Sequence, residues 1–200
     1  MKVLTKTSKH QADLVSENDG YRLDFEADEN RMGILYAIAA VIYVRDWTII
    51  EGKASITSGR VKDSFYLKSL DEGLSGFIKK FYILGDLKDV LDEEYSVAEY
   101  LSRFPEKLAQ LKKGREGFPL RYQIREDQDG EFLVIDIVAS DRPGLLLDIV
   151  RSFYYLYFDI HSMESRTIGT EAIDTFYVSR SKGELGEFDR DIIREILKKI

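Results

Sequence analysis

The feature that most constrains the fold of this chain is an internal repeat. When the sequence is shifted against itself by 111 residues, NRMGILYAI (30–38) falls on DRPGLLLDI (141–149), and the alignment continues without a gap to the D-x-F-Y pattern at 63–66 and 174–177. Upstream, a shift of 110 residues aligns NDG (18–20) with QDG (128–130), which predicts a loop one residue shorter before the first glycine. We therefore predict two copies of one folding unit.

The periodicity of the second copy predicts six elements in the order strand, strand, helix, strand, strand, helix. Their ranges are 119–125, 132–139, a helix from 145, 159–166, 172–180 and 191–200. This order fits a ferredoxin-like sandwich if the first hairpin strand forms an edge of the sheet, and residues 10–16 would do the same in the first copy. We predict an α+β fold of two such sandwiches, each a four-stranded antiparallel sheet with two helices on one face.

The two copies divide the chain into three segments. Residues 1–84 form the predicted first unit, with an insertion near 70–84 that has no counterpart in the second copy. Residues 85–117 form a charged, mostly helical connector that Pro105 breaks into two pieces. Residues 118–200 form the second unit. We call the two copies unit one and unit two.

The composition argues against several classes of function. The chain has no cysteine and only two histidines, His10 and His161, so thiolate catalysis and a His/Asp metal cluster find no support. The formal net charge of −7, from 36 acidic and 29 basic residues, disfavours nucleic acid as a partner. No apolar run reaches membrane-spanning length, and the N-terminal sequence MKVLTKTSKHQADLVSE lacks an apolar signal core. We expect a cytoplasmic, non-enzymatic protein with no catalytic residues, metal, cofactor or membrane partner.

The segment SDRPGLLLDI (140–149) combines residue types that suit a zwitterionic ligand. Gly144 permits a sharp turn and the close approach of a ligand, and Pro143 stiffens the loop at the start of the helix. The N–H groups of Leu145 and its neighbours point outward from the helix N-terminus and suit a carboxylate, while Asp141 suits an ammonium group or a helix cap. The same residues also make a good cap and turn, so a purely structural role stands beside the ligand site.

The equivalent segment of unit one, ENRMG (29–33), lacks both the aspartate and the proline. Asn30 can still cap the helix, and Gly33 still permits the turn. A weaker candidate site is predicted here, with a structural role as the alternative. It comprises Asn30, Arg31, Gly33 and Ile34.

Three motifs of unit two identify a family. They are D-x-P-G before the helix, DIHSMESRTIG (159–169) in the second strand and D-x-F-Y-V (174–178) in the third. Together they resemble an ACT domain, a small ferredoxin-like module that senses amino acids. The resemblance implies a ligand between the loop and the second strand of a paired domain, a strand that begins here at Ile160. The ligand-binding residues predicted in this way are Asp141, Arg142, Pro143, Gly144, Leu145, His161 and Ser162.

The tandem arrangement is similar to the C-terminal regulatory end of bacterial PII-uridylyltransferases and to free-standing ACT-repeat proteins. The chain has none of the nucleotidyltransferase or hydrolase motifs of those enzymes, so the resemblance is confined to regulation. It implies a sensor of a free amino acid, with glutamine as the candidate, that acts in nitrogen metabolism on an unknown regulatory protein partner.

Two other functions stay open. One is a protein–protein interaction or dimerisation module with no small-molecule ligand, and the other is a small enzyme on a ferredoxin-like scaffold. The outward strand positions Phe132, Val134 and Val138 of unit two are apolar, whereas those of unit one are charged. We expect that unit one or the inserted segment covers this face, or that the chain forms a homo-oligomer such as a dimer.

Overall fold

The computed structural model of the protein describes residues 9–70, 76–114 and 120–200. Unit one contains β1 (His10–Glu17), β2 (Gly20–Ala27), α1 (Ile34–Val44), β3 (Trp47–Thr57), β4 (Arg60–Ser69) and α2 (Gly76–Leu91). The connector contains α3 (Val97–Ser102) and α4 (Pro105–Lys113). Unit two contains β5 (Arg121–Glu126), β6 (Leu133–Ser140), α5 (Leu145–Tyr155), β7 (Phe158–Ile168), β8 (Glu171–Arg180) and α6 (Asp189–Leu197).

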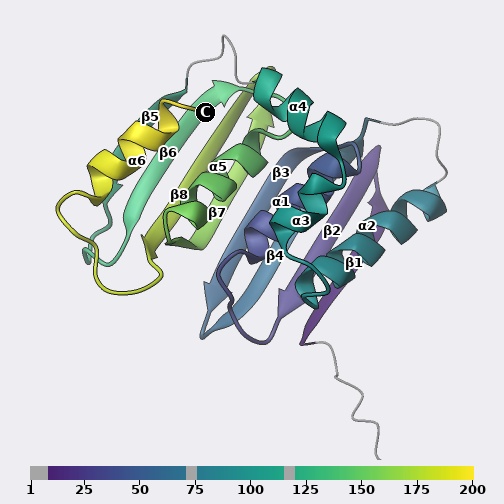
Figure 1. Ribbon diagram of the computed structural model, residues 1–200, viewed down its shortest axis with the longest axis horizontal. Coiled ribbons are helices and arrows are strands. Elements are labelled where there is room, and N and C mark those ends of the chain that lie inside the picture. Colours follow the sequence, from purple (N-terminus) through teal and green to yellow (C-terminus); the bar gives the residue numbers. More distant parts are fainter. Residues whose placement is uncertain (1–8, 71–75, 115–119) are drawn as a thin grey trace, which may run out of the picture.

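The strands form one antiparallel sheet of eight strands in the order β1-β2-β4-β3-β7-β8-β6-β5. The helices lie together over one face of this sheet (Figure 1). Each unit therefore supplies four strands and two helices, and β1 and β5 are the edge strands, which confirms the predicted α+β fold of two ferredoxin-like units. No helix within the three described ranges is long and apolar enough to span a membrane.

Two details of the repeat differ from the sequence alignment. Asp63 of β4 pairs with Phe25, and its equivalent Asp174 of β8 pairs with Ile137. The loop before the helix is therefore one residue longer in unit one, and the predicted shorter loop was wrong. A slip of two residues along a strand leaves every side chain on the same face, so the apolar alternation alone could not detect this error.

The predicted boundary between residues 84 and 85 falls inside α2. This helix packs on α1 and β1 and takes the place in unit one that α6 takes in unit two (Figure 1). The described part of the predicted insertion thus belongs to the second helix of unit one, while residues 71–75 lie outside the described residues. Residues 1–8 and 115–119, which the predicted segments also include, lie outside them as well.

The two units join edge to edge through β3 and β7, which pair antiparallel from Glu51 to Ser55. At the centre of this pairing, Lys53 lies opposite Glu164, its own equivalent in the repeat, and the two side chains form an ion pair at 2.9 Å. The bulges of the two strands also fall at equivalent positions, after Ile49 and after Ile160. The units are therefore related by an approximate twofold axis through this pair.

Equivalent tyrosines and glycines lock the helices across the same axis. Gly33 and Gly144 precede α1 and α5 with left-handed φ angles of 99° and 81°. A Cβ atom on Gly33 would lie 2.8 Å from the ring of Tyr154, and one on Gly144 would lie 3.0 Å from the ring of Tyr43. Both positions thus require glycine for two reasons, the backbone angle and the close approach of the tyrosine of the other unit.

The apolar outward face of unit two is covered by neither unit one nor the described part of the inserted segment. Unit one continues the same sheet, and α2 lies on the opposite face (Figure 1). Val134 is nevertheless only 1% exposed, because Arg125 and Tyr177 lie directly beside it on the neighbouring strands. Phe132 packs against the ring of His161 with the two ring planes tilted by 55°. Side chains of the face itself cover its centre, and the homo-oligomer stays a prediction.

The D-x-F-Y repeat places one buried aspartate in each unit, on the helix-covered face of the sheet. Asp63 is 3% exposed and Asp174 is 2% exposed. Burial raises the pKa of Asp63 to about 7, against a lowering effect of the hydrogen bond from the Ser55 amide. The native state therefore keeps this proton up to about pH 7, whereas the unfolded state loses it near pH 3.8. As a result, the free energy of unfolding falls as the pH rises between these values.

We expect the isosteric variant Asp63→Asn to be more stable than the wild type by about 4 kcal/mol at pH 8, because the amide stays neutral. The difference should shrink below pH 7 and vanish near pH 4. Urea unfolding of both proteins between pH 4 and pH 8 measures it. A difference that does not change with pH would show that Asp63 does not hold its proton in the native state.

Candidate functional site

Two cavities lie at the boundary between the units, related by the approximate twofold axis. Each combines the loop and helix N-terminus of one unit with the first residues of the central strand of the other. The first cavity joins the loop of unit one to the start of β7, and the second joins the loop of unit two to the start of β3. The residues that line the second cavity are Ala39, Ile42, Tyr43, Trp47, Thr48, Ile49, Asp141, Arg142, Gly144, Leu145, Leu146, Leu147, Ser165, Thr167, Ala172 and Asp174.

The predicted loop of unit two borders the second cavity through Asp141, Arg142, Gly144 and Leu145. Gly144 is the N-cap residue of α5, and no side chain bonds to the first amides of this helix. Asp141 does not cap the helix, because its carboxylate accepts a hydrogen bond of 3.0 Å from the Thr167 hydroxyl. Pro143 is exposed and does not line the cavity, whereas Leu145 is buried and does. The Leu145 amide, which was predicted to point outward, donates to the Arg142 carbonyl oxygen at 3.1 Å, so the amides of Leu146 and Leu147 are the ones in the first turn of α5 that favour an anionic group.

Arg142 is held in place by a buried ion pair. Its Nη2 donates to Asp148 at 2.8 Å, and Arg151 donates to the other oxygen of that carboxylate at 3.2 Å. The same Nη2 lies 3.5 Å from the carbonyl oxygen of Ile200. The Arg142 side chain is only 10% exposed, and its Nη1 has no hydrogen-bond partner. One edge of a buried guanidinium therefore remains available to an acceptor.

Asp174 of β8 places a carboxyl group in the wall of the second cavity that Arg142 also lines. Burial raises the pKa of this carboxyl to about 6, the hydrogen bond from Ser165 lowers it, and the nearby Asp141 raises it. Its Oδ1 is buried and has no hydrogen-bond partner. In the part of the chain that the structure describes, only two buried side-chain polar atoms lack a partner, Arg142 Nη1 and Asp174 Oδ1, and both residues line the second cavity.

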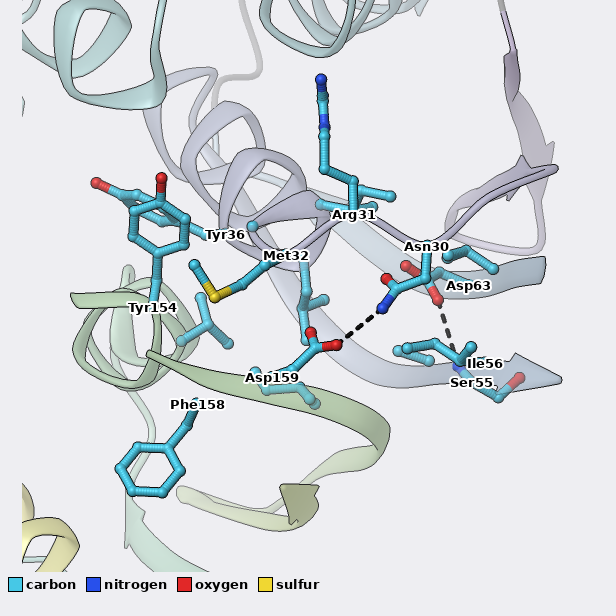
Figure 2. A pocket seen from close by; sticks show the side chains of 17 residues that line it. Asn30, Arg31, Met32, Tyr36, Ser55, Ile56, Asp63, Tyr154, Phe158 and Asp159 are labelled. Atoms are coloured by element: carbon cyan, nitrogen blue, oxygen red, sulfur yellow. Dashed lines mark hydrogen bonds between the residues drawn. The ribbon is translucent and has the colours of Figure 1, made fainter. Parts of the chain in front are cut away.

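The first cavity is built from the equivalent elements, but its polar groups are bonded to one another. Figure 2 shows Asn30 and Asp159 joined across the unit boundary, with a distance of 2.8 Å from Nδ2 to the carboxylate, and Asp63 bonded to the Ser55 amide. Arg31 extends away from these groups and binds Glu93 and the carbonyl of Leu91. Asn30 does not cap α1.

The remaining residues that line the first cavity are Arg31, Met32, Gly33, Ile34, Leu35, Tyr36, Ala54, Ile56, Val61, Val150, Tyr154, Phe158 and Ile160. All four residues of the weaker predicted site, Asn30, Arg31, Gly33 and Ile34, thus line this cavity.

His161 and Ser162 lie away from the predicted loop. Neither residue lines either boundary cavity. His161 points to the outward face, where Nε2 lies 2.9 Å from the Ser179 hydroxyl, and Ser162 pairs with Ser55 in the sheet. The antiparallel join places the start of β7 beside the loop of unit one, so the loop of unit two meets the start of β3 instead.

The connector helix α4 packs on the loop of unit two and on Tyr43, both of which line the second cavity. A Cβ atom on Gly144 would lie 2.5 Å from the side chain of Leu111, which is 1% exposed. The Tyr43 hydroxyl donates to the carbonyl oxygen of Lys107 at 2.8 Å, and the Lys107 ammonium pairs with Asp46. This helix thus contacts the loop of unit two and both ends of the α1–β3 connection of unit one.

Sequence reasoning missed most of the polar groups in the second cavity. Thr167 and Ser165 belong to a strand whose first residues, and not its last, were predicted to contact the ligand. Asp174 was noticed only as a landmark of the repeat. Its position could have been found, because an aspartate that shares the inward face with Phe176 and Val178 must be buried.

The boundary cavities are small, at about 40 Å³ for the first and about 30 Å³ for the second. Since about 10–15 Å³ of such volume suffices for one water molecule, the second has room for about two waters. Within the described ranges, no group of three or more histidine, aspartate or glutamate side chains is placed to hold a metal ion.

No family model matches the chain, but its sequence is similar to part of a known class of enzymes. It is 28% identical over 156 residues to the bifunctional uridylyltransferase/uridylyl-removing enzyme of Novosphingobium aromaticivorans, and 31% identical over 81 residues to that of Methylococcus capsulatus. These alignments cover 76% and 40% of this chain. They span only 17% and 9% of the respective relatives, so the chain corresponds to a small part of each.

The fold is also similar to a solved structure. Aspartate kinase from Synechocystis superposes with a TM-score of 0.50 over 91% of this chain and 26% of the kinase, at 13% sequence identity. At this identity the similarity concerns the fold alone. Together with the internal repeat, these similarities support the tandem ACT-domain arrangement that the motifs of the sequence predict.

Proposed function

We propose that this protein is a non-enzymatic regulatory protein that binds one free α-amino acid in the second cavity. The observation that carries this proposal is the pair of unpartnered buried atoms, Arg142 Nη1 and Asp174 Oδ1. A buried polar atom without a partner costs about 1–3 kcal/mol, and more when it is charged. Such a cost is typical of a site whose partner arrives from outside.

An α-amino acid satisfies both atoms at once. Its carboxylate suits Arg142 Nη1 and the first amides of α5, where the helix dipole adds to the attraction. Its ammonium group suits Asp174 Oδ1, with the Asp141 carboxylate nearby. The hydroxyl groups of Thr167 and Ser165 already bond to Asp141 and Asp174. These groups are therefore suited to binding a charged ligand and not to transferring a proton or acting as a nucleophile.

The position of α4 allows ligand binding to affect a surface that a partner protein could contact. This helix rests on Gly144 through Leu111 and is tied to unit one through Lys107. A ligand in the cavity would hold the loop, α1 and α4 together, because the loop and α1 line the cavity and α4 packs on both of them. We propose that a regulatory protein partner recognises this change in the connector.

A second candidate function is protein–protein interaction without a small ligand. Exposed aromatic side chains on α2 favour it, since Phe81 is 68% and Tyr82 is 43% exposed and their rings pack edge to face. This function requires no amino acid to bind, so the two candidates give opposite results in a ligand screen.

A thermal-shift screen of the twenty amino acids tests the proposal. At a hundredfold excess over Kd, one bound ligand adds about 2.7 kcal/mol, which raises the melting temperature by about 5–10 °C. We expect this shift to disappear in Asp174→Asn, which removes the charge without changing the shape. The matched control is Asp63→Asn at the equivalent position of unit one, which should keep the shift.

The outcomes of this screen separate the candidates. If no amino acid at 10 mM raises the melting temperature by more than about 1 °C, the interaction module replaces the sensor. A ligand whose shift is lost in Asp63→Asn but kept in Asp174→Asn would place the site in the first cavity and contradict the assignment made here.

Hydrogen exchange tests the role of α4. With the amino acid identified by the screen present at saturation, amides of 105–113 should exchange at least tenfold more slowly, while those of α6 on the far side of unit two should not change. If the first turn of α5 becomes protected and α4 does not, the connector does not report occupancy of the site.

A further inference from the structure

The second cavity has a charged end and an apolar end. Arg142, Asp174 and the first amides of α5 form the charged end. Apolar core residues of α1, β3 and β8 form part of the remaining wall, each 5% exposed or less: Ala39, Ile42, Trp47 and Ala172. If the head group of an amino acid occupies the charged end, its side chain must face this apolar wall.

The hydroxyl groups near the apolar end already form hydrogen bonds within the protein. The Thr167 hydroxyl donates to Asp141 and lies 3.4 Å from the carbonyl oxygen of Ile49. The Ser165 hydroxyl bonds to Asp174, and the Tyr43 hydroxyl donates to the Lys107 carbonyl. Thr48 lies between the inward residues Trp47 and Ile49, so strand alternation points its side chain to the other face of the sheet. A side-chain amide placed here would lose its water without gaining a partner.

The volume of the cavity sets a second limit. About 30 Å³, room for about two waters, is available before anything moves, so even a small amino acid requires the cavity wall to shift, and each added carbon enlarges that shift. Ile42 and Trp47 are each only 2% exposed and pack in the common core of the two units. A long side chain must displace them, and forcing extra atoms into a packed core typically costs 1–3 kcal/mol.

We infer that the amino acid bound in the second cavity is one with a small apolar side chain, of the glycine and alanine class. This inference rests on the proposed function and adds the chemistry of the ligand to it. It differs from the glutamine that the family resemblance implies, because glutamine would bring both a longer side chain and an unsatisfied amide to the apolar wall.

Isothermal titration calorimetry of the full chain with six amino acids separates size from polarity. Glycine and alanine are small and apolar, serine matches alanine in shape but adds a hydroxyl, valine and leucine add apolar volume, and glutamine is long and polar. We expect alanine to bind at least tenfold more tightly than leucine or glutamine, and more tightly than serine. Asp174→Asn should abolish the binding of alanine.

The result also distinguishes this inference from the proposed function. If glutamine or leucine binds more tightly than alanine and Asp174→Asn abolishes that binding, the inference on ligand class is overturned while the proposed function stands. If none of the twenty amino acids binds, both are overturned.

Enlarging the apolar wall provides an independent test. Ile42→Ala removes three carbon atoms from the wall, and we expect it to reduce the preference for alanine over valine at least tenfold without improving glutamine. Ile42→Val removes one carbon and should act in the same direction if the larger change prevents folding. An unchanged preference in a folded variant would show that this wall does not select the ligand.

Discussion

The antiparallel pairing of β3 with β7 determines the rest of this structure. It turns two four-stranded sheets into one of eight strands and places the helices of both units on the same face. The axis of the pairing passes between Lys53 and Glu164, which are equivalent residues of the repeat. Because the axis lies there, the loop of each unit meets the first residues of the central strand of the other. Both cavities, and the tyrosine that packs on each glycine, follow from this single join.

The two cavities show how a duplicated site can diverge within one frame. In the first, the Asn30 amide donates a hydrogen bond to the Asp159 carboxylate, and the Arg31 side chain points outward and binds Glu93. In the second, Arg142 turns inward to a buried ion pair, and one edge of it and one oxygen of Asp174 remain unsatisfied. The loop of the second cavity thus has D-x-P-G and leaves two buried polar atoms without partners, whereas the loop of the first has N-x-M-G and its polar groups are bonded within the protein. The connector adds to the difference, since α4 packs on the second loop through Leu111.

Much of the fold could be predicted from the sequence, because the repeat and the periodicity of its strands are local properties. The strand order within each unit and the loop at Gly144 followed from them. The register of β2 and β6 did not, since a shift of two residues preserves the pattern of faces. The boundary at residue 84 was placed inside α2 because the aligned matches end at the D-x-F-Y pattern, although at the same shift of 111 residues α2 falls on α6.

The composition of the site depended on the join between the units, which no local pattern encodes. The start of β7 was assigned to the ligand through His161, yet its alternation turns that residue to the outward face beside Ser179. Asp174 could have been identified as a buried charge from its neighbours Phe176 and Val178. That its free oxygen and Arg142 line the same cavity could be seen only once both units were assembled.

Of the two related cavities, we propose that only the second binds a zwitterion. The most direct test is the stoichiometry of amino-acid binding to the full chain, measured by equilibrium dialysis with the radiolabelled ligand. The structure predicts one molecule per chain, because only the second cavity has a guanidinium edge and a carboxylate oxygen without partners in the described residues. Two molecules per chain would show that the first cavity binds equally, and a value of zero would contradict the sensor altogether.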